Sequence, residues 1–257
     1  YNRIQLMIHS ISVPTKAKTV SFVWQHTLLL VSLFFMTAGV ALCVRSNLGS
    51  SVISSCPLAF TLAGESAMAP NLSLGTYTNI LNALLVVGQI AILRRRFQPV
   101  QLLQLLIGFV FGAMIDLNMR LTSVLDCSSP TSQALAQFAG CTVMAFGIAM
   151  EMRCASITMP GEGLPAAISK VTGRQFADIK IRIDILLVAM AVVACYMFFG
   201  RWLWNVVGAG TLFAMVYVGF AVKWFSARSG WFDRLLGYRP GIRRYVYGLK
   251  RFVNGRR

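Results

Sequence analysis

The chain has 257 residues, of which 56% are hydrophobic and only 12% are charged, and its formal net charge is +16. An ordinary soluble domain has about 25% charged residues, so this composition excludes such a domain and favours lipid as the solvent. The basic residues lie between apolar runs and in the C-terminal tail, which indicates the cytoplasmic flank of a membrane protein and excludes nucleic acid as a partner.

Six apolar runs are long enough, or nearly so, to cross a bilayer, which takes about 20 residues. They cover 23–43, 76–93, 102–122, 133–150, 183–199 and 203–223. Two further apolar segments, 51–64 and 158–173, are shorter and are each interrupted by proline. Re-entrant or broken helices are the prediction for both, although spanning remains open. If both spanned, the triplet Arg94–Arg96 would face outward, against the positive-inside rule.

The two halves of the chain resemble each other when 39–60 is laid over 147–168. The matched residues are Gly39 with Gly147, Ala41 with Ala149, Arg45 with Arg153, Pro57 with Pro165 and, after a gap, Asn82 with Asp184. Three spans per half place the halves in opposite orientations, as in many transporters with inverted repeats. The predicted regions are a cytoplasmic segment 1–22, membrane repeats 23–124 and 125–225, and a basic cytoplasmic tail 226–257.

The short segments also carry a resemblance to a known family. LGSSVISSCPLAF in the first half and MPGEGLPAAIS in the second, taken in this order, resemble the YczE/YyaS/YitT-like family of bacterial integral membrane proteins. The similarity runs from about Leu29 to Phe225. It implies a multi-pass protein of the bacterial inner membrane, from a family described as transporters without an agreed substrate.

Polar residues within apolar segments are costly and therefore mark candidate sites. Arg45 and Arg153 precede the short segments and are predicted to converge on a central cavity, where helix N-termini would add positive potential for an anionic solute. Headgroup contact, or pairing with Glu151, is the alternative. The predicted solute-binding residues are Arg45, Arg153, Asn82, Gln89, Ser51 and Ser54.

Three acidic residues are predicted to couple transport to protons or Na⁺. Glu162 lies between two glycines in PGEG, Asp184 is the counterpart of Asn82, and Glu151 lies near Arg153. Helix capping is the alternative role for Glu162. The chain lacks P-loop, HExxH and GxSxG motifs and has only two histidines, so no enzyme activity, metal site or cofactor is predicted.

The predicted protein is all-α, with about six transmembrane helices in two inverted three-helix repeats, each with a short re-entrant or broken helix. Its predicted function is alternating-access transport or export of a small anionic solute. A non-transporting protein that binds and regulates a protein or lipid partner is the alternative, and lipid flipping is a third. Both termini are predicted to be cytoplasmic, and a homodimer is possible because small residues occur on helix faces.

The C-terminal tail interleaves basic and aromatic residues, from Ser226 to Arg257. This pattern is typical of an interfacial helix on anionic lipid, which makes anionic lipid a predicted partner of the tail. A solvated basic tail is the alternative.

Overall fold

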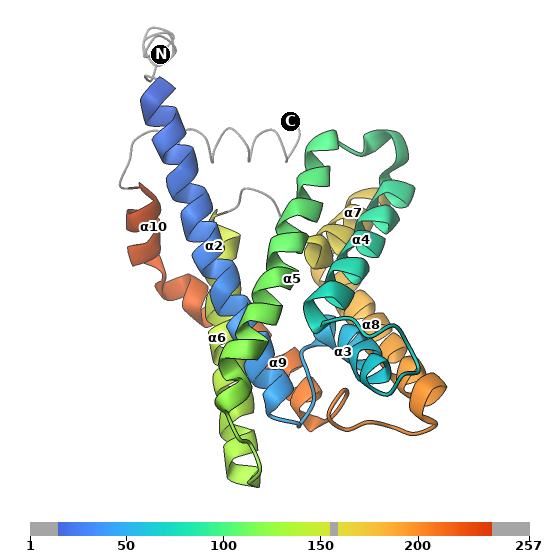
Figure 1. Cartoon of the computed structure of the whole chain (residues 1–257). Coiled ribbons are helices and arrows are strands. Elements are labelled where there is room, and N and C mark those ends of the chain that lie inside the picture. Colours follow the sequence, from blue (N-terminus) through green and yellow to red (C-terminus); the bar gives the residue numbers. More distant parts are fainter. Residues whose placement is uncertain (1–14, 155–158, 238–257) are drawn as a thin grey trace, which may run out of the picture.

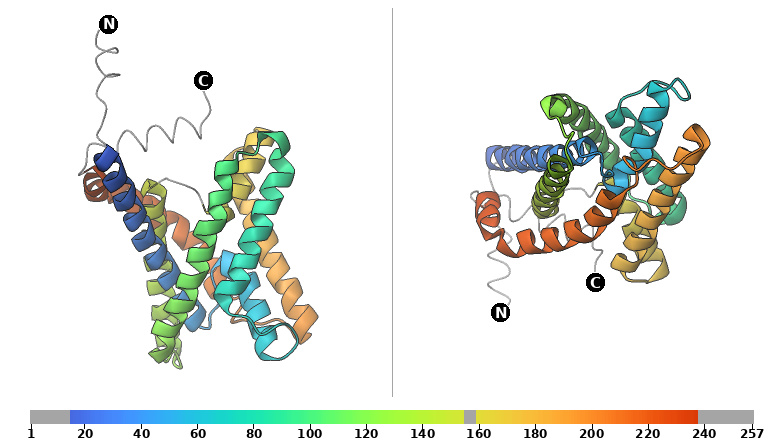
Figure 2. Two further views of the ribbon diagram at one scale, coloured as in Figure 1. Left: turned by 45° about the horizontal axis from the view of Figure 1, so that its top comes forward. Right: turned by 90° about the horizontal axis from the view of Figure 1, so that it is seen from below.

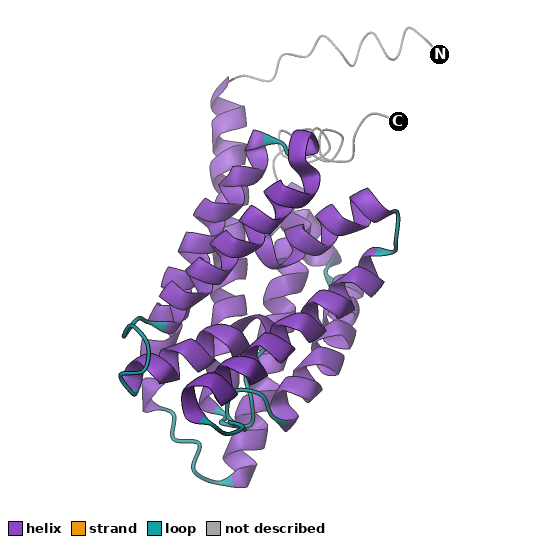
Figure 3. Cartoon of the chain, turned by 90° about the vertical axis from the view of Figure 1, so that its right-hand side faces the viewer, coloured by secondary structure: helices purple, strands orange, loops and turns teal. Residues whose placement is uncertain are grey.

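The computed structural model describes residues 15–154 and 159–237, and within them the chain is helical without strands (Figures 1 and 3). The α-helices are α2 (Thr15–Arg45), α3 (Val52–Glu65), α4 (Leu74–Leu93), α5 (Leu103–Leu121), α6 (Pro130–Cys154), α7 (Pro160–Thr172), α8 (Phe176–Phe199), α9 (Ala209–Arg228) and α10 (Gly230–Gly237). Short 3₁₀ turns cover Arg94–Arg96, Pro99–Leu102 and Thr122–Val124.

Six of the described helices are long and apolar enough to cross a membrane, as predicted. The candidate spans are Val23–Arg45, Leu74–Arg96, Leu103–Val124, Pro130–Cys154, Asp178–Phe199 and Ala209–Arg228. Leucine, isoleucine, valine and phenylalanine side chains cover the outer faces of these helices, where only lipid can accommodate so much apolar surface. The chain is therefore an all-α multi-pass membrane protein.

Some predicted boundaries shift. The last span was expected over 203–223, but α8 ends at Gly200 in the left-handed conformation (φ 63°) and α9 begins only at Ala209. The residues between them form an apolar loop, in which the Trp202 indole donates to the Val207 carbonyl (2.7 Å). Hydropathy alone does not separate such a loop from a helix.

Helices continue beyond both ends of the predicted membrane repeats. Helix α2 begins at Thr15, inside the expected N-terminal segment 1–22, and α9 continues to Arg228 before α10 follows. The Trp24 indole donates to the Leu235 carbonyl (3.1 Å) and so connects α2 to α10. Residues 1–14 and the rest of the predicted tail, 238–257, lie outside the described residues.

The short helices α3 and α7 have 14 and 13 residues, about 20 Å each, and neither crosses the molecule (Figure 1). The loops on either side of α3 lie at the same, lower end of the molecule in Figure 1. The first turns of the two helices meet in the interior, because a Cβ atom on Gly161 would lie 2.4 Å from Ile53 Cδ1. Helices α4 and α8 pack on both short helices and so separate them from lipid.

Helices α2 and α6 form the centre of the molecule and pack more extensively than any other pair. Glycines let their backbones approach closely: a Cβ on Gly39 would lie 2.5 Å from the Gly140 carbonyl oxygen, and one on Gly147 would lie 2.5 Å from the Met36 nitrogen. Small residues commonly allow such close crossings between membrane helices.

The remaining helices pack around this pair across the two halves. Helix α3 lies mainly against α8, and α7 lies mainly against α4, while α5 packs on α2 and α9 on α6. Helices α4 and α5 pack along each other, but α8 and α9 do not, and α9 extends away from α8 toward α10 (Figure 2). The two halves therefore have equivalent helix–helix contacts, except that α4 packs on α5 and α8 does not pack on α9.

The loops divide by charge between the two ends of the molecule. The turn that contains Arg94–Arg96 lies at the same end as the start of α2 and the α7–α8 connection (Figure 1). Lys170, in the last turn of α7, and Arg174, in the connection, add basic residues there. Loops 66–73, 122–129 and 201–208 lie at the other end and hold a single basic residue, Arg201. By the positive-inside rule, this asymmetry favours a cytoplasmic upper end in Figure 1.

Candidate functional site

Polar side chains and glycines alternate along the contact between α4 and α5. Asn79 faces Gly112 and Asn82 faces Gly108, since a Cβ on either glycine would touch the facing side-chain amide. Nearer the outer end, Asp116 accepts hydrogen bonds from the Gly75 amide (2.8 Å) and the Ser73 hydroxyl (2.6 Å). In lipid, such contacts hold helices together, because an unpaired polar group has no water to bind.

The Asn79 amide oxygen is buried without a hydrogen-bond partner, and Asn82 carries this feature furthest. Its side chain is 1% exposed, yet neither its amide nitrogen nor its amide oxygen has a hydrogen-bond partner. A buried polar group left unpaired costs about 1–3 kcal/mol. An amide held at this cost is a candidate ligand for a polar solute.

Gln89 lies on the same face of α4, about 10 Å further along. It donates to Gln104 of α5 (3.1 Å) and, more weakly, to the Pro160 carbonyl at the start of α7 (3.5 Å). Gly163 makes room for both amides, because a Cβ there would lie within 2.9 Å of them. This glutamine pair connects α4 and α5 to the first turn of α7.

Ser51 and Ser54 lie at the first turn of α3. Both are buried, and their hydroxyl oxygens are 2.6 Å apart, so they hydrogen-bond to each other. The Ser54 hydroxyl also donates to the Ser51 carbonyl (3.1 Å). The two predicted serines therefore lie together at the start of a re-entrant helix, near the meeting point of Ile53 with Gly161.

Two carboxylates, Glu151 of α6 and Glu162 in the first turn of α7, lie within electrostatic range of each other. Glu151 is 5% exposed and makes no hydrogen bond with a described residue. Glu162 is also within range of Lys180 and Asp184. Asp184 itself accepts a 2.6 Å ion pair from Lys180, one turn away on α8. Lys180 therefore pairs directly with Asp184 and also acts on Glu162.

Arg45 and Arg153 do not converge in this structure. The Arg45 guanidinium donates to the Met119 carbonyl near the end of α5 (2.9 Å), and Arg153 donates to the Ser226 and Ser229 carbonyls at the end of α9. Ser46, next to Arg45, hydrogen-bonds to Gln137 of α6, so Arg45 lies level with Gln137. Arg153 lies 16 residues further along α6, so about 24 Å of helix separates the two arginines. Each arginine satisfies carbonyls that a helix end leaves unpaired.

Gln104 was not predicted, although it belongs with Gln89. The sequence feature that could have identified Gln104 is its spacing of four residues from Gly108. This spacing places both residues on the face of α5 that α4 covers. Within the described residues, no three His, Cys, Asp or Glu side chains are placed to hold a metal ion. We call Asn82, Gln89, Gln104, Glu151 and Glu162 the central polar cluster.

These features define a class: an all-α membrane protein with two re-entrant helices that meet beside buried, partly unpaired polar groups. A family model matches residues 23–227, and the chain belongs to this family, the Family of unknown function (DUF6198). No curated protein and no solved structure matches the chain. The similarity to the YczE/YyaS/YitT-like family remains a resemblance.

Proposed function

We propose that this protein transports a small polar solute across the membrane by alternating access between two states of an inverted repeat. The observation that carries the proposal is the difference between the halves. Helix α4 packs along α5, whereas α8 and α9, their counterparts, stand apart. In an inverted repeat, exchanging the roles of the two halves generates the second state without a new fold.

The contacts between α2 and α6 support the repeat, because each recurs when 108 is added to the number of the residue in the first half and subtracted from the number of its partner in the second half. The contacting pairs are Gly39 with Gly140, Gly39 with Met144, Gly147 with Ser32 and Gly147 with Met36. Ile53 and Gly161, also 108 positions apart, touch each other and so lie next to the two-fold axis. Contacts of this kind follow from a two-fold relation and not from sequence similarity alone.

The arginine contacts extend the same relation to α5 and α9. Arg45 donates to residue 119 and Arg153 donates to residue 226, each close to the end of its partner helix. In the second state, α8 would pack on α9 as α4 now packs on α5. The offset between residues 119 and 226 is 107 positions, and with this offset Gly219 is the counterpart of Gly112. Nothing now lies within 4 Å of a Cβ placed on Gly219.

The groups of the central polar cluster favour a neutral polar or cationic solute. Its members offer amides and carboxylates, and Lys180, a basic group within electrostatic range of Glu162, is paired with Asp184. An anionic solute was predicted on the basis of Arg45 and Arg153, which in this state bind helix-end carbonyls. Proton or Na⁺ coupling through Glu151 or Glu162 remains a prediction.

The unpaired amide of Asn82 gives a direct test of solute binding. We would measure thermal unfolding of the purified protein with a panel of small amines, amides, sugars and carboxylates, on the parent and on Asn82→Leu. A solute at 100 times its dissociation constant should stabilise the parent by about 2.7 kcal/mol. Asn82→Leu should lose this response and yet unfold at the same or a higher temperature, because it removes an unpaired polar group.

Asn118→Leu is the matched control, since Asn118 is equally buried but donates to Thr37 (2.9 Å) and to the Met114 carbonyl (3.0 Å). This variant should lose stability by about 1–3 kcal/mol while keeping the solute response. A parent that responds to no compound, or an Asn82 variant that responds as the parent does, would remove the support for transport. The partner-binding alternative would then be preferred.

A further inference from the structure

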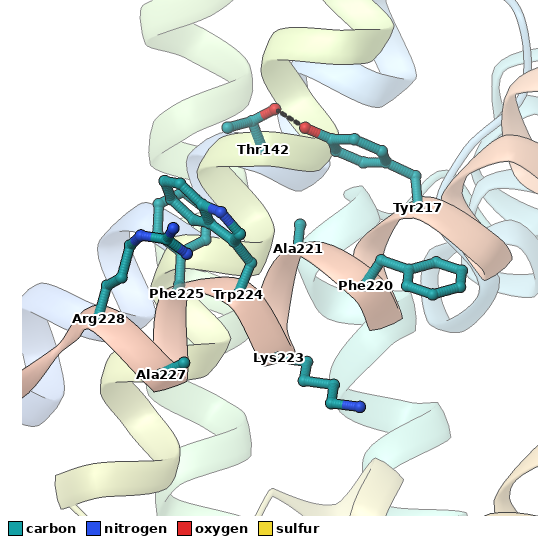
Figure 4. Close-up of a pocket in the computed structure, with 9 residues that line it drawn as sticks. All are labelled: Thr142, Tyr217, Phe220, Ala221, Lys223, Trp224, Phe225, Ala227 and Arg228. Atoms are coloured by element: carbon teal, nitrogen blue, oxygen red, sulfur yellow. Dashed lines mark hydrogen bonds between the residues drawn. The ribbon is translucent and has the colours of Figure 1, made fainter.

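An apolar groove follows one face of α9. Helix α9 packs on α6, and α4 and α5, which carry three residues of the central polar cluster, lie on the other side of α6 (Figure 2). Its volume is about 750 Å³, within the range of ligand pockets. The lining residues that matter here are Thr142, Tyr217, Phe220, Ala221, Trp224 and Arg228 (Figure 4). Positions 217, 220, 221, 224 and 228 recur at helical spacing, so they form one continuous stripe.

The two ends of the groove differ in chemistry. At one end the Thr142 and Tyr217 hydroxyls hydrogen-bond to each other (2.9 Å), which leaves no polar group there in need of a ligand. At the other end the Arg228 guanidinium lies 4.3 Å over the Trp224 ring (Figure 4). Lys223 lines the edge of the groove, and its ammonium group points away from Arg228 (Figure 4). Neither cation forms an ion pair with a described residue. A ligand with an apolar body and a negatively charged head matches this division.

The position of the cations also matches such a ligand. Arg228 ends α9 on the side of the membrane that holds Arg94–Arg96, which the positive-inside rule makes cytoplasmic. Tryptophan is typical of the headgroup level, and Trp224 lies one turn before Arg228. The cytoplasmic leaflet is the one rich in anionic lipid, which attracts basic residues near its surface.

We propose that this groove is a binding site for one anionic phospholipid of that leaflet. Its phosphate contacts Arg228 beside Trp224, and an acyl chain lies along Trp224, Ala221 and Phe220 toward Tyr217. About 16 Å separates Arg228 from Tyr217 along the helix, which suits an acyl chain and exceeds a small anion. The basic C-terminal tail is a poor occupant, because it carries the same sign of charge as the two cations.

The test compares lipid retention by the full chain in neutral detergent, using native mass spectrometry with phosphatidylglycerol and phosphatidylcholine. The charge variant is Arg228→Gln, and its controls are Lys223→Gln, whose ammonium points away from the proposed headgroup position, and Arg174→Gln, an exposed basic residue outside the groove. The charge variant should lose about tenfold in phosphatidylglycerol affinity and little for phosphatidylcholine. Both controls should stay within about twofold of the parent.

A second variant, Ala227→Trp, fills the groove from an exposed position and should weaken both lipids. Glycerol phosphate, which has the headgroup charge but no acyl chain, should not compete. Equal lipid retention by all variants, or full competition by glycerol phosphate, would overturn the proposal. So would an Ala227→Trp variant that changes from dimer to monomer without a change in lipid, because the groove would then hold a second copy.

Discussion

At the scale of residues, charge inside the membrane has two different origins in this protein. Arg45 and Arg153 were predicted as ligands because each lies in an apolar region at an equivalent position of its half. The equivalence is seen in the structure, where each arginine donates to carbonyls near the end of a neighbouring helix. Their contacts with carbonyls of α5 and α9 depend on which helices pack together, which the sequence around them does not encode. Asn82 and Gln89 were placed on one inward face by their spacing of seven, but only packing distinguishes the unpaired amide from the paired one.

Arg45→Met should lower stability without changing the affinity for solute. The substitution removes the donor to the Met119 carbonyl from a half-buried side chain, and a hydrogen bond to a charged group is worth about 1.5–3 kcal/mol. Thermal unfolding measures the loss, and the solute response in the same assay measures the affinity. Arg120→Met, at an exposed position on α5, is the control and should leave both unchanged. An Arg45 variant with normal stability and no response to solute would restore the predicted anion site.

At the scale of elements, hydropathy and charge predicted six spans and two short helices, and the described structure has these helices. Prolines and glycines identified α3 and α7 as unusual segments, and the positive-inside rule correctly favoured leaving them out of the spans. The apolar loop 201–208 was misread as helix because its residues suit either environment. The close α2–α6 crossing was visible only as the matched glycines Gly39 and Gly147, whose packing partners lie about 100 residues away.

Gly39→Ala should destabilise the α2–α6 crossing. Its new methyl group would lie 2.5 Å from the Gly140 carbonyl oxygen and the Met144 nitrogen, and backbone atoms cannot move aside as a flexible side chain does. Overpacking of this kind costs about 1–3 kcal/mol, which a thermal unfolding scan detects. Gly219→Ala introduces the same methyl group into a helix with nothing within 4 Å and should unfold with the parent. Equal stability of the two variants would mean that the close crossing is absent from the protein in solution.

At the scale of the whole molecule, the difference between α4–α5 and α8–α9 predicts a second conformation. Hydropathy cannot predict whether α4 packs on α5 or α8 packs on α9, because all four helices are apolar enough to span a membrane. The state described here has α4 on α5, and exchange would bring Ile181 of α8 beside Gly219 of α9, as Asn79 now lies beside Gly112.

Disulfide formation in native membranes tests this exchange. Asn82→Cys with Gly108→Cys should cross-link readily, since a Cβ on Gly108 would lie 3.4 Å from Asn82 Cβ, close to the usual separation in disulfides. Ile181→Cys with Gly219→Cys should also cross-link, but only through the second state, and these two exposed positions tolerate substitution. Cross-linking of the first pair alone, under every solute condition, would contradict alternating access.

The exchange of short helices between the halves has a consequence for synthesis of the chain. Helix α3 finds its main partner in α8, whose first residue follows the last residue of α3 by more than 100 positions, while α7 uses α4 from the first half. During translation the first half therefore inserts with α3 packed only on α4, and α3 lacks its main partner until residue 199 has left the ribosome. Neither half is an independent folding unit, so a nascent chain that stops before α8 presents an uncovered re-entrant segment to the proteases that monitor the membrane.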